Sequence, residues 1–133
     1  MRRAAHILVL DSALDPDGVP SRETVQYRAG DPPLYRVFLY LDGNDLPYVE
    51  GVTYHLHETF PRPRREVRRT PSNPRCKLVL WTWGIFEVRA VIRDKRGSDH
   101  EVRHQLTYDR VFSSLDRDKF QVAPPTSGSS PVE

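Results

Sequence analysis

The sequence predicts an all-β fold, either a β-sandwich or a small barrel of short strands. Several segments alternate apolar and polar side chains, which is the pattern of half-buried strands. Turn-forming residues separate these segments, and no periodicity indicates a helix longer than about two turns. The 133 residues include 12 prolines, a content that stops helices and favours turns and edge strands.

The first half of the chain predicts three strands joined by loops. Residues 5–10 are a short apolar run that is typical of a strand. Residues 11–34 are rich in Asp, Gly and Pro and indicate a loop, within which residues 21–27 fit one helical turn or a short strand. Residues 35–41 and 52–60 predict two strong strands, each with alternate side chains on opposite faces.

The second half carries the longest β signal. Prolines isolate a short edge strand over residues 64–68. Residues 77–93 follow with a long apolar and alternating pattern, in which Gly84 predicts a bulge or a close backbone approach. Residues 95–98 indicate a hairpin turn, and residues 101–109 return as the pairing strand.

We expect a single sandwich over residues 33–122, because a chain of this length suits one domain with one hydrophobic core. Residues 1–32 would form an N-terminal strand and loop extension. Residues 123–133, rich in Ser, Gly and Pro, would form a flexible tail.

The net charge of +2 hides an uneven distribution. Residues 1–60 contain five Lys or Arg and nine Asp or Glu, whereas residues 61–120 contain fifteen and eight. A basic second half is suited to an acidic partner.

The single cysteine, Cys76, excludes an internal disulfide and favours a reducing compartment. The apolar start is too short for a signal peptide and lacks a cleavage site, and no stretch approaches the ~20 apolar residues of a membrane helix. We therefore expect a soluble, cytoplasmic protein without membrane contact.

Two motifs are the most distinctive segments of the sequence. Residues 54–67 read YHLHETFPRPRREV, and residues 82–92 read TWGIFEVRAVI. In this order and spacing they resemble the signature of YEATS domains, a His-x-Ser/Thr-Phe strand that runs into a basic, Pro-rich loop and, later, a Trp-Gly-x-Phe strand. The resemblance covers roughly residues 33–112 and implies an immunoglobulin-like β-sandwich of the prokaryotic type.

Well-known YEATS domains bind acylated lysine between two aromatic side chains. By resemblance, Phe60 and Trp83 would form the two walls of such a slot, and the Thr59 hydroxyl would bind the acyl amide. The resemblance also gives His57 a role in shaping the site beside Thr59.

Two further residues complete the expected slot. By resemblance, Gly84 would let the ligand approach the backbone, and Phe86 would close the floor. One departure from the family is the stretch TPSNPRCKLVLWTW, which carries basic residues where the family's readers usually carry Pro-Pro-Phe and an acidic residue.

Physical chemistry independently favours a neutral ligand in an aromatic slot. Aromatic faces stabilise a planar group by ~0.5–1.5 kcal/mol per contact. An unpaired buried amide costs ~1–3 kcal/mol, so its polar atoms need partners. Unmodified lysine would lose the hydration of its ammonium, which cation–π attraction offsets only in part.

Other interpretations of the same residues remain open. Phe60, Trp83 and Phe86 could simply be core residues, and Trp81 could be a slot wall, a core residue or an exposed contact. His55 and His57 have the spacing of a metal pair on a strand, but structural histidines are the commoner outcome. We find no catalytic constellation around Cys76, no phosphate-binding loop and no cofactor motif, so we expect no enzyme, no metal and no cofactor.

A basic run is the strongest charge feature. It could be a solvated strand face or a contact surface for an acidic protein partner. Nucleic acid is less favoured, because no base-stacking aromatics are interleaved with the charges. The residues that we expect on this surface are Arg62, Arg64, Arg65, Arg68 and Arg69. The alternative function is therefore a protein-interaction adaptor in a bacterial signalling or effector system, without a lysine pocket.

Overall fold

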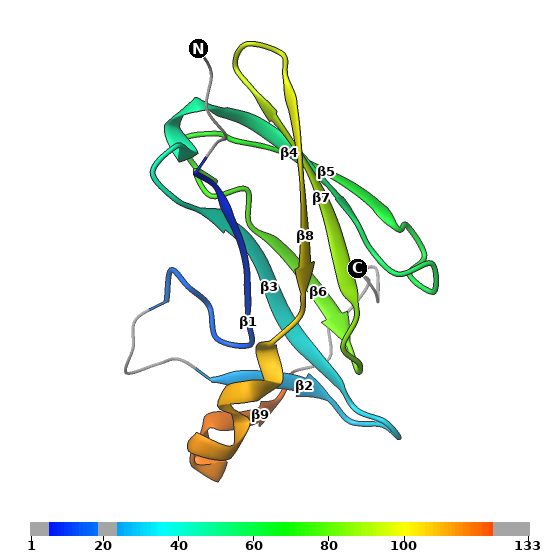
Figure 1. The fold of residues 1–133 in the computed structure, drawn as a ribbon. Helices are drawn as coiled ribbons and strands as arrows, with labels where there is room; N and C mark the ends of the chain where they lie inside the picture. The colour runs from blue at the N-terminus through cyan, green and yellow to red at the C-terminus, as the bar shows by residue number, and fades with distance from the viewer. Residues whose placement is uncertain (1–5, 19–23, 124–133) are drawn as a thin grey trace.

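The structure, a computed structural model, describes residues 6–18 and 24–123, which fold into two β-sheets packed face to face (Figure 1). This confirms the predicted all-β sandwich. Sheet A contains β1 (Leu8–Ser12), β2 (Val25–Arg28), β3 (Leu34–Asp42), β6 (Leu78–Thr82) and β9 (Phe120–Val122). Sheet B contains β4 (Val49–His55), β5 (Arg64–Arg68), β7 (Glu87–Asp94) and β8 (Asp99–Gln105). The short 3₁₀ helices in this part are η2 (Leu46–Tyr48), η3 (Tyr108–Ser114) and η4 (Arg117–Lys119).

Strand β3 is the centre of sheet A. It pairs antiparallel with β1 and β2 along one edge and with β6 along the other, and β9 adds to β2 in parallel. Val37, Leu39 and Leu41 of β3 are fully buried against sheet B, as the alternation predicted. Phe38 on the opposite face is also buried, because the charged ends of Arg36 and Lys77 cover its ring.

Sheet B has the order β5-β4-β7-β8, with every pair antiparallel. The bounds of β5 match the predicted edge strand. Val88, Ala90 and Ile92 of β7 are fully buried, as their alternation predicted. The β7–β8 hairpin turns at residues 95–98, where Gly97 adopts a φ of 88°.

Three predicted strands are shorter or interrupted in the structure. The strand expected over residues 101–109 ends at Gln105 of β8, and Tyr108 already belongs to the 3₁₀ helix η3. The strand expected over residues 52–60 ends at His55, because the chain turns at His57 and then meets Pro61 and Pro63. The long β segment of residues 77–93 breaks at residues 83–86 into β6 and β7, which belong to different sheets. Gly84 therefore marks a crossing between the sheets.

The part of the chain that was expected to form an N-terminal extension, residues 1–32, contributes the strands β1 and β2 to sheet A. β1 pairs with β3 over five residues, and the ambiguous segment at residues 21–27 forms β2 from Val25 onward. The first strand begins at Leu8, whereas residues 1–5 lie outside the described part of the chain. The expected tail, apart from Ala123, also lies outside it.

A buried carboxylate joins the two sheets along one side. Asp11 of β1 has a fully buried side chain and accepts hydrogen bonds from the His104 ring at 2.6 Å and from Thr107. Beside it, the Phe112 ring packs on Tyr35 and Tyr108, with centroids 4.9 and 5.9 Å away. None of the helices formed by the described residues has the length and apolar character needed to cross a bilayer.

Candidate ligand-binding site

The first half of the site is the loop of residues 56–63, which joins β4 to β5. The backbone N–H of Leu56 donates to the Pro63 carbonyl at 2.7 Å and closes the base of this loop. The N–H of Phe60 donates to the His57 carbonyl at 3.1 Å and forms the turn inside it. The sequence favours this shape because Pro61 and Pro63 cannot continue a paired strand.

His57 and Thr59 form a hydrogen-bonded pair at the tip of this loop. The His57 Nδ1 atom accepts the backbone N–H of Thr59 at 3.2 Å, and the Thr59 hydroxyl lies 2.9 Å from the same nitrogen. Because Nδ1 serves as an acceptor, the neutral ring carries its proton on Nε2. The Thr59 hydroxyl can donate to Nδ1 and still accept a hydrogen bond from a ligand.

The second half of the site is the crossing from β6 to β7. Trp83 leaves 66% of its surface exposed, and Ile85 leaves 42%. The space around Gly84 is open, since a Cβ there would have no neighbour within 4 Å. The Gly84 N–H has only a long contact of 3.4 Å to the Thr82 hydroxyl, so it can donate to a ligand.

Phe86 brings the two loops together. Its ring lies 5.4 Å from the Phe60 ring and 6.1 Å from the His57 ring, both in tilted or edge arrangements. Phe60 and Phe86 are half-buried and rest on the core. Trp83 instead extends outward, and no ring contact joins it to Phe60 among the described residues. The structure thus places His57, Thr59, Phe60 and Phe86 next to one another, whereas Trp83 lies exposed at the edge of this group.

The residues that hold the crossing loop from the core side belong to neither sequence motif. The Tyr108 hydroxyl donates to the Gly84 carbonyl at 3.3 Å, and the N–H of Leu106 donates to the Phe86 carbonyl at 3.1 Å. The only sequence signal is that Leu106 and Tyr108 would share one face of the strand expected over residues 101–109. It indicated burial but not these contacts, which join residues about twenty positions apart.

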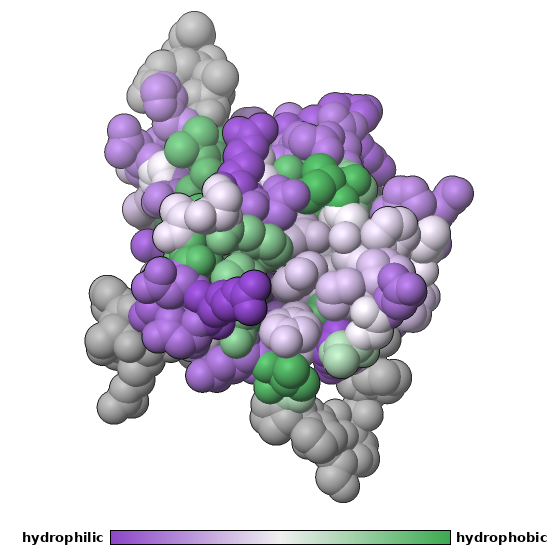
Figure 2. Space-filling view, turned by 90° about the horizontal axis from the view of Figure 1, so that it is seen from below, coloured by the Kyte–Doolittle hydropathy of each residue, from purple (hydrophilic) through white to green (hydrophobic). Residues whose placement is uncertain are grey.

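Figure 2 shows the end of the sandwich seen from below. Apolar side chains reach this surface in several patches among polar ones. Scattered exposed apolar side chains are ordinary on a protein surface and do not by themselves mark an interface.

The expected basic surface is divided in the structure. The expectation that Arg65 lies on this surface was wrong, because the residue is 6% exposed and faces inward opposite Tyr54. Its Nε atom donates to the Arg62 carbonyl. Its position on an inward-facing site of β5 removes it from any exposed surface.

The remaining arginines point in different directions. Arg64 and Arg68 are exposed on the outer face of β5, and Arg64 forms an ion pair with Glu66. Arg69 turns back and donates from Nε to the Pro74 carbonyl at 3.0 Å. Only part of the expected basic patch can therefore meet one partner.

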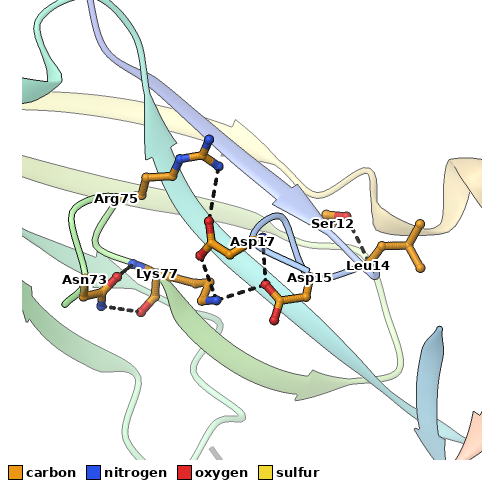
Figure 3. A network of polar contacts seen from close by, with 7 residues as sticks. All are labelled: Ser12, Leu14, Asp15, Asp17, Asn73, Arg75 and Lys77. Atoms are coloured by element: carbon orange, nitrogen blue, oxygen red, sulfur yellow. Dashed lines mark hydrogen bonds and ion pairs between the residues drawn. The ribbon is translucent and has the colours of Figure 1, made fainter. Parts of the chain in front are cut away.

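Two basic residues further along the chain, Arg75 and Lys77, form ion pairs within the molecule. Lys77 Nζ lies 3.0 Å from both Asp15 and Asp17, and Arg75 lies 3.9 Å from Asp17 (Figure 3). Partial burial lowers the pKa of Lys77, but hydrogen bonds to the two carboxylates outweigh it and leave the pKa raised. This network fastens the segment after β1 onto sheet A.

The histidines and the cysteine have structural surroundings. His100 donates to Asp94 at 2.9 Å, and this hydrogen bond contributes most to lowering the pKa of Asp94 to about 2. Burial raises the pKa of the Cys76 thiol to about 11, and its side chain is inaccessible. Burial, and then the charges of Arg89 and Arg64, lower the pKa of His55. Within the described ranges, no three His, Cys, Asp or Glu side chains gather closely enough to hold a metal ion.

Comparison with known proteins connects this geometry to a family. The model of the prokaryotic YEATS domain matches residues 35–107, which is more than half of the chain. A second match is to transcription initiation factor TFIID subunit 14 of Schizosaccharomyces pombe, with 35% identity over 68 residues. That alignment covers 50% of this chain and 26% of the yeast protein, so the chain spans only about a quarter of that relative.

The solved structures that match this chain include two of the Yaf9 YEATS domain. The structure described as bound to H3K27ac is 14% identical with a TM-score of 0.46, and the alignment covers 83% of this chain and 82% of that one. The structure described as recognising an H3K122suc peptide is 16% identical with a TM-score of 0.48, and the alignment covers 81% and 79%.

Proposed function

Because this chain belongs to the family of prokaryotic YEATS domains, we propose that it is a non-catalytic module that binds a peptide through an acylated lysine or a similarly flat side chain. One observation carries the proposal. The exposed Trp83 and the open Gly84 stand on a loop whose Phe86 packs against Phe60 and His57 of the other motif.

The planar acyl group would lie between the Phe60 and Trp83 side chains. Phe60 is positioned by its contact with Phe86, so it supplies a fixed wall. Trp83 has most of its surface free, so it can close over the ligand as the second wall. Each stacked face would stabilise the bound group by ~0.5–1.5 kcal/mol.

The amide of the ligand would be paired at both ends. Its N–H would donate to the Thr59 hydroxyl, which His57 Nδ1 holds at 2.9 Å. Its carbonyl would accept the Gly84 N–H, whose contact within the protein is long. These two partners avoid the ~1–3 kcal/mol that an unpaired buried amide costs, and they distinguish the acyl amide from an ammonium.

The test is a titration with acetyl-lysine and crotonyl-lysine peptides in a Trp81→Phe background, so that Trp83 is the only tryptophan. We expect saturable quenching by acylated peptides and little response to the unmodified lysine peptide. Trp83→Ala, followed by calorimetry, should weaken binding about tenfold, as the loss of one stacked wall predicts. An affinity unchanged by Trp83→Ala, or no binding at millimolar peptide, would contradict the proposal.

A second candidate function is an adaptor that meets a protein partner through the outer face of sheet B. A hollow of about 430 Å³ on this face favours it. The residues that line the hollow include Gly51 and Thr53 of β4, Val91 of β7 and charged residues of both signs. Arg64 and Arg68 of the expected basic patch line its rim.

Charge reversal at Arg64 and Arg68 distinguishes the two functions. It should abolish capture of an adaptor partner and leave acyl-lysine binding unchanged. Trp83→Ala should have the opposite effects. If charge reversal weakens the peptide affinity as strongly as Trp83→Ala does, the two surfaces are not independent.

A further inference from the structure

We infer that Tyr108 is a positioning residue for the ligand site and acts by holding the Gly84 carbonyl. The inference rests on the proposed function, since it assigns a role within the same site. Tyr108 itself is 4% exposed and is not part of the slot walls. Its hydroxyl reaches the loop of residues 83–86 from the core side, 3.3 Å from the carbonyl that follows Trp83 and belongs to Gly84.

The loop needs an external support because its own side chains provide little. Trp83 and Ile85 point into solvent, and Gly84 has no side chain and open space around it. Phe86 is the residue that anchors the loop to the core cluster. Between Thr82 and Phe86, the contact from Tyr108 therefore fixes the direction of the Gly84 carbonyl. This carbonyl shares its peptide unit with the Ile85 N–H, and the Gly84 N–H that would meet a ligand lies on the other side of the same Cα.

The support is itself fixed to the other sheet. Asp11 accepts the N–H of Thr107 at 2.8 Å, the hydroxyl of Thr107 at 3.1 Å and the ring of His104 at 2.6 Å. Because the Asp11 side chain is fully buried, these bonds are shielded from water. They hold the segment that begins at His104 and ends at Tyr108 as one unit, from which Leu106 donates to the Phe86 carbonyl.

The surroundings of the Tyr108 ring keep its hydroxyl in place and protonated. The ring packs on Tyr35 and Phe112, with centroids 6.3 and 5.9 Å away. Burial raises the pKa of Tyr108 to about 12, and the nearby Asp109 adds to the shift. The hydroxyl therefore remains a donor at every pH at which the peptide would be tested.

The protein offers a matched control at the opposite end of β6. Tyr54 is fully buried, and its hydroxyl donates to the Cys76 carbonyl at 2.8 Å. Tyr108→Phe and Tyr54→Phe thus remove the same kind of bond, a tyrosine hydroxyl to a loop carbonyl, and keep the ring. Only the first bond belongs to the loop that carries Trp83.

The experiment compares these two variants by peptide affinity and by unfolding. Tyr108→Phe should weaken the acyl-lysine peptide about fivefold, the factor that one ordinary hydrogen bond represents. Tyr54→Phe should leave the affinity within about twofold while it lowers the unfolding midpoint. Equal losses of affinity in both variants would assign Tyr108 a general structural role and overturn the inference. An unchanged affinity in Tyr108→Phe would overturn it as well.

A second measurement, on the free protein, separates this inference from the proposed function. In the Trp81→Phe background, Tyr108→Phe should change acrylamide quenching of Trp83 and speed amide exchange at residues 84–86, and Tyr54→Phe should do neither. If these changes appear and the wild-type protein binds no acylated peptide, the positioning role stands and the proposed ligand fails. If peptides bind and neither signal changes, the positioning role fails and the proposed ligand stands.

Discussion

The loops at the two ends of β6 are held by the same kind of hydrogen bond, but the first loop is buried at Cys76 and the second is exposed at Trp83. Before β6, the Tyr54 hydroxyl donates to the Cys76 carbonyl, and after it the Tyr108 hydroxyl donates to the Gly84 carbonyl. At the first end Cys76 is inaccessible, whereas at the second end Trp83 is 66% exposed. The comparison shows that the same kind of backbone anchor can hold either a buried loop or an exposed one.

The difference lies in the side chains that accompany each anchor. At the first end, the Asn73 side chain bonds to both backbone groups of Lys77, at 2.8 and 3.0 Å. Lys77 also forms ion pairs with Asp15 and Asp17, so these bonds join the loop before β6 to the segment after β1 (Figure 3). At the second end the supporting bonds, from Tyr108 and Leu106, come from the core side, and Trp83 stays exposed.

The largest effect should come from substituting a residue between the two ends. Leu80 is fully buried in the middle of β6, and Leu80→Ala should reduce the free energy of unfolding by ~2–5 kcal/mol, because it leaves a cavity. Trp83→Ala, which removes a larger but exposed side chain, should cost less than ~1 kcal/mol. Urea unfolding measures both. Similar losses in the two variants would mean that Trp83 is a core residue.

The next effect concerns the reactivity of Cys76. Its pKa of about 11 exceeds its ordinary value of 9, so the folded protein keeps the thiol protonated as the pH rises. At pH 9, alkylation should be at least ~50-fold slower in the folded than in the urea-unfolded protein, as mass spectrometry can follow. Because the folded pKa is the higher one, the thiol's contribution to stability is present below pH 9 and is lost as the pH rises toward 11. Equally fast alkylation in both states would show that this end of β6 opens.

A smaller effect should follow from removing the cation of the first end. Lys77→Met should destabilise the protein by ~1 kcal/mol, because Asp15 and Asp17 then lose their shared partner on a partly exposed surface. Thermal unfolding at low and high salt provides the measurement. The difference between the variant and the wild-type protein should shrink at high salt, and a salt-independent difference would point to lost packing on Phe38 instead.

The smallest effect on stability should come from Gly84→Ala. A Cβ at this position meets nothing within 4 Å, so the free energy of unfolding should change by less than ~0.5 kcal/mol. Gly51→Ala in β4 is the control, since its Cβ would lie 2.9 Å from the Val67 carbonyl and should destabilise the pairing of β4 with β5. A large loss of stability in Gly84→Ala would show that the space above the loop is filled.

Local sequence pattern predicted much of this fold. Alternation in β3 identified Val37, Leu39 and Leu41 as core residues, and flanking prolines predicted the bounds of β5. The same alternation failed for residues 56–60, because a turn closed by backbone bonds there outweighed the β pattern. The run of basic residues predicted Arg65 on an exposed surface, although adjacent residues of a strand face opposite sides, so Arg64 and Arg65 cannot share one face.

The sequence by itself determined the fold class, the main strands and the family, because side-chain periodicity and two spaced motifs are local properties of the chain. Only the tertiary structure decided that β6 and β7 belong to different sheets and that Trp83 stands outside the core at their crossing. It also decided that Tyr108 and Asp11 support that crossing. The physical reason is that these contacts join segments far apart along the chain, and no local pattern records which buried donor will face which carbonyl.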